Sequence, residues 1–239
     1  MKIFVYKIII FCCIVLLFQT CKDSTCIQSN GKEITQNIFV DTFSTVMIYG
    51  ICDITILPDT INYITIQGGK NHIELCSLQQ SKGAIQWYNS ATCGFFKQFE
   101  HIALTIHTTN LDSIILYSPC SLITDTLKRN LFLSAQTEMI KAQIIVNNKL
   151  TKIDTYYKAG GLLKIKGNTD VCNITANYTI QVDSKYLQTT KAIITNNTIQ
   201  DMYISVSDSL VAKTSKSGYI YFSGNPQFIS TKGNIKPIL

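Results

Sequence analysis

Most of this 239-residue chain alternates between apolar and polar positions. The clearest run is HIALTIH, residues 101–107, in which Ile102, Leu104 and Ile106 fall on one side of an extended chain. Alternation with a period of two, together with many β-branched residues, predicts strands. The three-and-four spacing of an amphipathic helix is almost absent, so we expect an all-β protein.

The predicted strands recur in a regular way. From Leu111 onward, units of about 20 residues each contain an apolar strand, a polar corner rich in Asn and Gly, and a second short strand. No unit has enough apolar surface to bury itself, so stacked units predict a single-stranded parallel β-helix, or β-solenoid, with short strands and Asn/Gly corners. In the last well-formed unit, SGYIYFSGNP (217–226), Ile220 and Phe222 should point inward and Tyr219 and Tyr221 outward.

The N-terminus has a different pattern. Lys2 and Lys7 flank the start of an apolar run, residues 8–18, that is too short for a membrane span and has the form of a signal peptide over residues 1–20. The LFQT–Cys21 sequence is similar to a bacterial lipobox, which predicts lipid attachment at Cys21. Residues 21–38 would then be the lipidated N-terminus and tether, and residues 39–239 a single domain. A plain secreted protein is the alternative.

Charge and cysteine content narrow the function classes. The formal net charge is +6, with no run of five basic residues, so a nucleic-acid partner is not expected. Without the signal peptide and Cys21, six cysteines remain at wide, irregular spacings, and no C-x-x-C pair supports a zinc ribbon or redox motif. They fit small buried residues better than a disulfide framework, and their pairing stays open: Cys26, Cys52, Cys76, Cys93, Cys120 and Cys172.

Candidate chemistry is sparse. The three histidines, His72, His101 and His107, lack a third ligand in sequence, the aspartates are scattered, and Arg129 is the only arginine. We therefore predict no catalytic residues, no metal and no cofactor. A β-helix enzyme that degrades polysaccharides is the alternative, and it would require converging carboxylates. A structural component of the envelope is a second alternative.

Aromatic residues are the remaining candidates for ligand contact. Trp87 and Tyr88 form the only tryptophan-bearing cluster, and Tyr219 and Tyr221 alternate on the last unit. Aromatic rings could face a sugar ligand. A structural role is the more common one for such residues: Trp87 would close one end of the core, and the tyrosines would stack as ladders along the sheet.

Two motifs carry a family resemblance that spans residues 40–239. Phe43-x-x-Val46-x-Ile48-x-Gly50-x-x-Asp53-Ile54-x-Ile56 near the start, and Leu210-x-Ala212 followed by SGYIYFSGNP near the end, resemble the "putative auto-transporter adhesin, head GIN domain" family of Bacteroidetes. The chain departs from the family's repeated Ser-Gly-x-Gly turns and has Cys52 where an asparagine is usual. The resemblance implies a parallel β-helix in the cell envelope, no established catalytic residues and, by the family's name, an adhesin. The lipobox, the repeat and the absence of clustered catalytic residues predict a module that binds a glycan or extracellular protein. Its expected location is the outer membrane or cell surface, membrane-bound through the lipid, with a periplasm-facing orientation as the alternative. An oligomer is compatible with the sequence.

Overall fold

The computed structural model describes residues 29–91 and 102–238. This part of the chain is almost entirely strand, which confirms the all-β prediction, and one short helix, α2 (Lys70–Ile73), interrupts it. The strands are β1 (Glu33–Phe39), β2 (Thr45–Ile48), β3 (Cys52–Leu57), β4 (Tyr63–Gly69), β5 (Cys76–Ser81), β6 (Ala84–Asn89), β7 (Ala103–His107), β8 (Ser113–Leu116), β9 (Cys120–Leu127), β10 (Leu131–Ala135), β11 (Ile140–Thr155), β12 (Gly160–Thr198), β13 (Met202–Thr214), β14 (Ile220–Ser223), β15 (Phe228–Lys232) and β16 (Ile235–Pro237).

All sixteen strands join one curled, open sheet of mixed strand orientation. The pairings β1/β4, β4/β7 and β5/β6 are antiparallel, and the others are parallel. The prediction of a parallel β-helix throughout is therefore wrong for the N-terminal part. Alternation fixes which side chains face the core, but it does not fix strand direction. Here the chain reverses between β3 and β4 instead of continuing around the coil.

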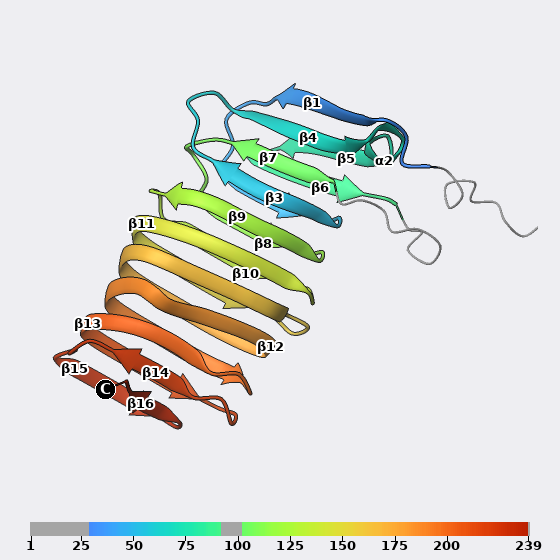
Figure 1. The fold of residues 1–239 in the computed structure, drawn as a ribbon. Coiled ribbons are helices and arrows are strands. Elements are labelled where there is room, and N and C mark those ends of the chain that lie inside the picture. The colour runs from blue at the N-terminus through green and yellow to red at the C-terminus, as the bar shows by residue number, and fades with distance from the viewer. Residues whose placement is uncertain (1–28, 92–101, 239) are drawn as a thin grey trace, which may run out of the picture.

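The curl of the sheet creates two walls. We call the ladder β4-β7-β3-β9 and the first half of β11 the first wall, and the ladder β6-β2-β8-β10 and the second half of β11 the second wall. Within β11, Ile140 to Val146 pair with β9 and Thr151 to Thr155 pair with β10. The residues between those segments form a corner from the first wall to the second. The stacked turns are visible in Figure 1.

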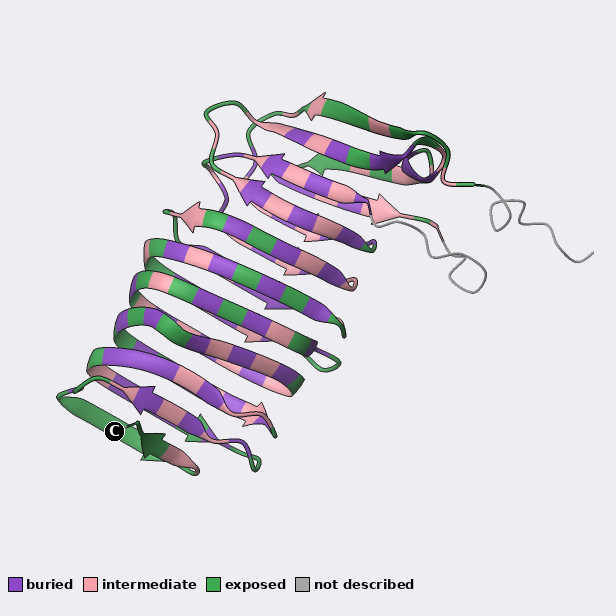
Figure 2. Ribbon diagram, viewed as in Figure 1, coloured by how far each residue is buried: buried purple, intermediate pink, exposed green. Residues whose placement is uncertain are grey.

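The core lies between the walls. Alternate residues of most strands are buried, as the banding in Figure 2 shows, and isoleucine dominates the inward set. The edge strands β1, β5, β15 and β16 have no buried residue. Stacked positions such as Ile144 and Ile165 sit in register in consecutive turns, so each buries the next. Burial of this kind, at roughly 25 cal/mol per Å² of apolar surface, is the main stabilising force of a stacked architecture.

The predicted signal peptide and tether lie mostly before the first residue that the structure describes. The signal peptide, Cys21 and most of the predicted tether lie outside the described residues. β1 occupies residues 33–39, so the last part of the stretch predicted as tether pairs with β4. Within residues 29–91 and 102–238, no helix has the length and hydropathy needed to cross a bilayer.

Candidate functional site

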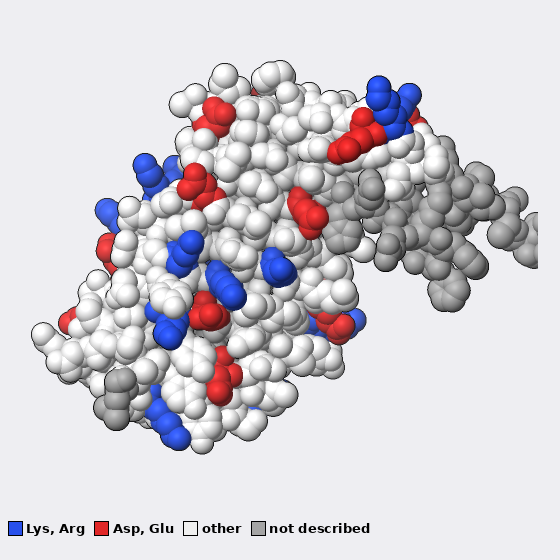
Figure 3. Space-filling model, viewed as in Figure 1, with Lys and Arg blue, Asp and Glu red and all other residues white. Residues whose placement is uncertain are grey.

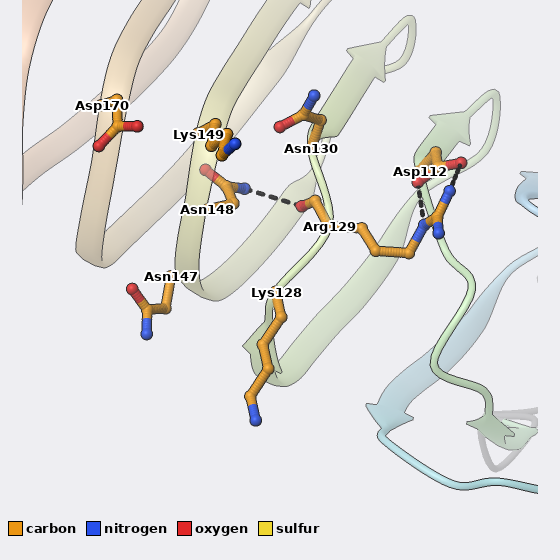
Figure 4. A pocket seen from close by; sticks show the side chains of 8 residues that line it. All are labelled: Asp112, Lys128, Arg129, Asn130, Asn147, Asn148, Lys149 and Asp170. Carbon is orange, nitrogen blue, oxygen red and sulfur yellow. Dashed lines mark hydrogen bonds and ion pairs between the residues drawn. The ribbon is translucent and has the colours of Figure 1, made fainter.

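One series of corners in the described region forms a groove. A polar groove of about 650 Å³ crosses the turns where the chain passes from the first wall to the second (Figure 4). We call it the corner groove. Its lining residues are Asp112, Lys128, Arg129, Asn130, Asn147, Asn148, Lys149 and Asp170.

Four consecutive turns supply these side chains. Asp112 precedes β8, residues 128–130 join β9 to β10, residues 147–149 are the corner inside β11, and Asp170 belongs to the next corner, inside β12. Neighbouring turns are about 4.8 Å apart. The sequence places polar residues here because a corner side chain points away from the core, and Asn accepts corner geometry readily.

Asn148 fixes the floor of the groove. Its Nδ2 donates to the Arg129 carbonyl at 3.0 Å, and its Oδ1 accepts from Thr151 Oγ1 at 3.0 Å and from Thr169 Oγ1 at 2.7 Å. Asn130 Oδ1 accepts from the Leu150 amide at 3.1 Å. Side-chain bonds between turns thus hold three successive corners in one arrangement, which is the kind of support that preorganises a binding surface.

A second fixed contact closes one end of the groove. Arg129 donates to Asp112 through Nε to Oδ1 at 2.5 Å and through Nη2 to Oδ2 at 2.8 Å. These two bonds raise the pKa of Arg129, and the geometry is the planar, two-point fit of guanidinium and carboxylate. Both side chains remain about half exposed, so we expect the pair to orient Arg129 more than to stabilise the fold.

Four other lining side chains are uncommitted. The structure gives no partner among its described residues to the side chains of Lys128, Asn147, Lys149 and Asp170. In Figure 4, Lys128 and Asn147 lie on one side of the Arg129–Asn148 line, while Asn130, Lys149 and Asp170 lie on the other. The corner groove therefore has a fixed floor and two banks of free polar groups.

A smaller cavity of about 360 Å³ adjoins this groove. It shares Lys128 and Arg129 with the corner groove and is otherwise lined by Pro58, Thr108, Thr109, Leu111, Asp125, Thr126 and Leu127. The shared residues place the two cavities next to each other on one side of the molecule.

Tyr88, one of the predicted ligand-facing aromatics, belongs to a stacked ladder on the second wall. Tyr49 stacks on Tyr88 at 4.8 Å and on Tyr117 at 4.5 Å between ring centroids, with interplanar angles of 5° and 6°. Burial raises the pKa of Tyr49, and the bond to Tyr117 raises it further. Tyr49 therefore has a ring on each face, whereas Tyr88 and Tyr117 each have one face covered by Tyr49. The role of Tyr88 as a ligand contact stays a prediction.

Tyr219 and Tyr221 form a comparable cluster near the C-terminus. Tyr221 stacks on Tyr203 at 5.3 Å and lies 5.7 Å from Tyr219, and Lys236 Nζ sits 4.5 Å above the Tyr219 ring. Both tyrosines are half-buried on the outward side of their turn, as predicted, while Ile220 and Phe222 point inward. Their role as ligand contacts stays a prediction.

Trp87 is not available to a ligand. Its side chain is 1% exposed and packs in the core at the N-terminal end, where β6 pairs with β2. The prediction that Trp87 faces a ligand is therefore wrong, and the alternative, that it closes the core, fits the structure. Residue type alone does not decide such a position, because tryptophan occurs both in cores and at binding surfaces, whereas the alternation places Trp87 on the same face as the buried Ile85.

The described histidine, cysteine and acidic side chains do not form a cluster that could act as a metal site. Among the described residues, no three His, Cys, Asp or Glu side chains are arranged to hold a metal. Cys52, Cys120 and Cys172 are buried free thiols, which agrees with the expectation of small core residues, and Cys76 is a partly buried one. Cys26 and Cys93 lie outside the described residues. On the face shown in Figure 3, several basic residues lie near one another across the middle of the molecule, with acidic residues beside them.

Sequence reasoning missed the corner groove. Its signal was present as polar breaks, Lys128-Arg129-Asn130 and Asn147-Asn148-Lys149, that recur at the repeat spacing. From the sequence alone, such breaks predict turns and nothing more. Recognising a groove requires the stacking register, which places the breaks beside one another.

Comparisons with known proteins agree with the fold. A 2.07 Å crystal structure of a "putative adhesin" from Bacteroides fragilis covers 87% of this chain and 97% of its own, with 16% identity and a TM-score of 0.77. A "putative adhesin" from Parabacteroides distasonis gives 13% identity, coverage of 87% and 98%, and a TM-score of 0.62. A "putative lipid binding protein" from the same species has 14% identity, covers 88% of this chain and 98% of its own, and has a TM-score of 0.58. A search of curated proteins gave no significant match.

The family comparison is more specific than these structural likenesses. The model for the family described as "Putative auto-transporter adhesin, head GIN domain" matches residues 42–226, which include both motifs quoted above. The match extends over well more than half of the chain, and the chain therefore belongs to this adhesin head GIN domain family.

Proposed function

We propose that this protein is a lipoprotein of the cell envelope that binds a glycan or protein ligand without catalysing a reaction. Its parallel part, from β8 onward, would act as a β-solenoid that carries the corner groove. Family membership supports an adhesin-like role at the cell surface or envelope. The observation that carries the proposal is the groove itself, because its floor is fixed by bonds between turns while its banks keep free hydrogen-bonding groups.

The spacing of the groove's carboxylates favours binding over hydrolysis. Asp112 is engaged by Arg129, and the other carboxylate, Asp170, lies three turns away. Three turns correspond to about 14 Å. Paired carboxylates of glycoside hydrolases are about 5–9.5 Å apart, so these two would be too distant to share one glycosidic bond.

Ligand binding is tested with an array of glycans and extracellular-matrix proteins, probed with the chain from Lys22 onward. We expect retention by at least one ligand class, weakened when Asn147 and Asp170 are both replaced by alanine. A double alanine variant at exposed Lys213 and Lys232, in β13 and β15, serves as the control and should bind normally. Equal binding by all three proteins would place the ligand elsewhere, and no binding at all would contradict the binding role.

Membrane attachment through Cys21 is a separate part of the proposal. The lipobox-like sequence before Cys21 supports it. Metabolic labelling with palmitate should mark the wild-type protein and not a Cys21→Ala variant, and the variant should leave the membrane fraction. Labelling of the variant would refute the anchor. Protease treatment of intact cells would then distinguish the surface-facing from the periplasm-facing orientation.

One observation favours a second candidate, assembly of an envelope structure. Every residue of β15 is exposed, with Phe228 and Ile229 at 56% and 50%, and among the described strands β15 pairs only with β13. Exposed, apolar edge strands can add further strands from another chain. Sedimentation at several concentrations tests this candidate: oligomers that dissociate in an Ile229→Lys variant would support it, and a monomer throughout would exclude it.

A further inference from the structure

We propose that the corner groove binds an anionic oligosaccharide, with acid groups directed to Lys128 and Lys149 and sugar hydroxyls to Asn147 and Asp170. This inference rests on the proposed binding function and names the ligand class of the same groove. It commits to carbohydrate, and an acidic protein or a nucleic acid would be a contradictory outcome.

Charge within the groove is the first argument. Three cations and two carboxylates line it, but Arg129 and Asp112 neutralise each other through their two hydrogen bonds. The charges that remain free are two ammonium groups, on Lys128 and Lys149, and one carboxylate, on Asp170. Uncompensated cations in a concave polar surface attract anions and steer their approach.

The placement of the lysines is the second argument. Lys128 and Lys149 come from adjacent corners and lie on opposite banks of the groove, on either side of the Arg129–Asn148 floor (Figure 4). A single small anion would leave one bank unused. An extended chain with acid groups at intervals could lie along the floor and reach both banks, and its direction would follow the stacked corners.

The chemistry of the lining distinguishes sugar from protein. All eight lining residues are Asn, Asp, Lys or Arg, so none offers the apolar or aromatic anchor that dominates binding energy in protein interfaces. Amide and carboxylate groups suit hydroxyl-rich ligands, because Asp170 can accept from two hydroxyls and Asn147 can both donate and accept. The groove also has no ring on which bases could stack, which argues against single-stranded nucleic acid.

The test uses titration calorimetry with the chain from Lys22 onward and size-matched ligands. The probes are oligogalacturonate for carboxylates, heparin fragments for sulfates, laminarin oligosaccharides as neutral sugars, polyglutamate as an acidic peptide, and oligoadenylate. We expect one or both acidic sugars to bind at least about tenfold more tightly than the neutral sugar, with affinity falling as salt rises. Comparison of oligogalacturonate with the heparin fragments shows whether carboxylates or sulfates are recognised.

Variants place the binding in the groove. Lys128→Gln with Lys149→Gln should weaken acidic-sugar binding at least about tenfold. Lys164→Gln with Lys166→Gln removes the same charge from exposed positions of β12 and should change little. Three outcomes would overturn this inference without contradicting a binding function: unchanged affinity in the groove variant, equal affinity for the neutral sugar, and preference for polyglutamate or oligoadenylate. Failure of every probe, and of every ligand on the array, would overturn both.

Discussion

Arg129 holds Asp112 across adjacent turns of the sheet through two hydrogen bonds, 2.5 Å and 2.8 Å long. The two residues are 17 positions apart and meet only because their corners stack. The contact occupies the guanidinium of the only arginine in the chain, which would otherwise add a third free cation to the corner groove.

Replacing Asp112 by asparagine should therefore tighten the binding of anionic oligosaccharides. Asp112→Asn keeps the shape of the side chain but removes its charge, so Arg129 becomes available to the ligand. The melting temperature should hardly change, because both partners are well exposed. Calorimetry with the acidic probe measures the affinity. Asp125→Asn, in the adjoining cavity, removes the same charge without freeing Arg129 and should give a smaller gain; equal gains would show that only net charge matters.

We expect Gly167, which lies where β12 leaves the first wall at a corner, to tolerate no other residue. Gly167 has a φ of +109°, and an added Cβ would lie 2.0 Å from the carbonyl oxygen of Val146 in the neighbouring turn. Gly167→Ala must therefore displace a paired strand, and we expect a loss of more than about 3 kcal/mol of unfolding free energy.

Gly83 is the matched control for that substitution. It also has a positive φ, +73°, but an added Cβ would meet nothing within 4 Å. Gly83→Ala should cost only the backbone strain, about 1–2 kcal/mol. Urea unfolding of both variants measures the difference. Similar losses would mean that close approach between turns does not determine the glycine requirement.

The sequence predicts inward and outward positions well and strand direction poorly. Ile220 and Phe222 point inward, and Tyr221 outward, because a period of two determines the face of each side chain. The same pattern is present in β4, yet β4 runs antiparallel to β7. Direction depends on where the chain reverses, and residues 58–62 carry no signal that separates a reversal from a corner.

The candidate site was harder to predict for a related reason. Asn148 looks like any turn asparagine in the sequence, but its side chain bonds to Arg129 in the preceding turn and to Thr169 in the following one, and only the stacking register brings these residues together. For Trp87 the residue type allows both a binding surface and a core position, and its pairing with β2 places it in the core.

The burial of Trp87 gives a direct optical prediction. Trp87 is the only tryptophan of the chain, so the intrinsic tryptophan fluorescence reports on this residue alone. We expect native emission shifted to the blue, weak quenching by acrylamide, and no change when ligand binds in the corner groove. Unfolding in urea should shift the emission to the red. Strong quenching of the native protein would mean that the indole is exposed.

A buried thiol should make the stability of the fold depend on alkaline pH. Burial raises the pKa of Cys172 to about 12, whereas a thiol in an unfolded chain ionises near 8.5. Above pH 9 the unfolded chain loses this proton and the native chain keeps it. The native state then binds more protons, so its stability falls as pH rises through the window from about 9 to 12.

A Cys172→Ala variant isolates this effect. At pH 7 we expect it to be about 1 kcal/mol less stable than the wild type, because a small buried group is lost. Between pH 9 and pH 10 that difference should shrink by about 1.2 kcal/mol, since only the wild type loses the thiol contribution, while other ionising groups are common to both proteins. Val182→Ala, which removes a buried group that does not ionise, should show a constant cost across the same range. Urea unfolding at each pH measures both differences, and a pH-independent cost for Cys172→Ala would show that its thiol ionises alike in the native and unfolded states.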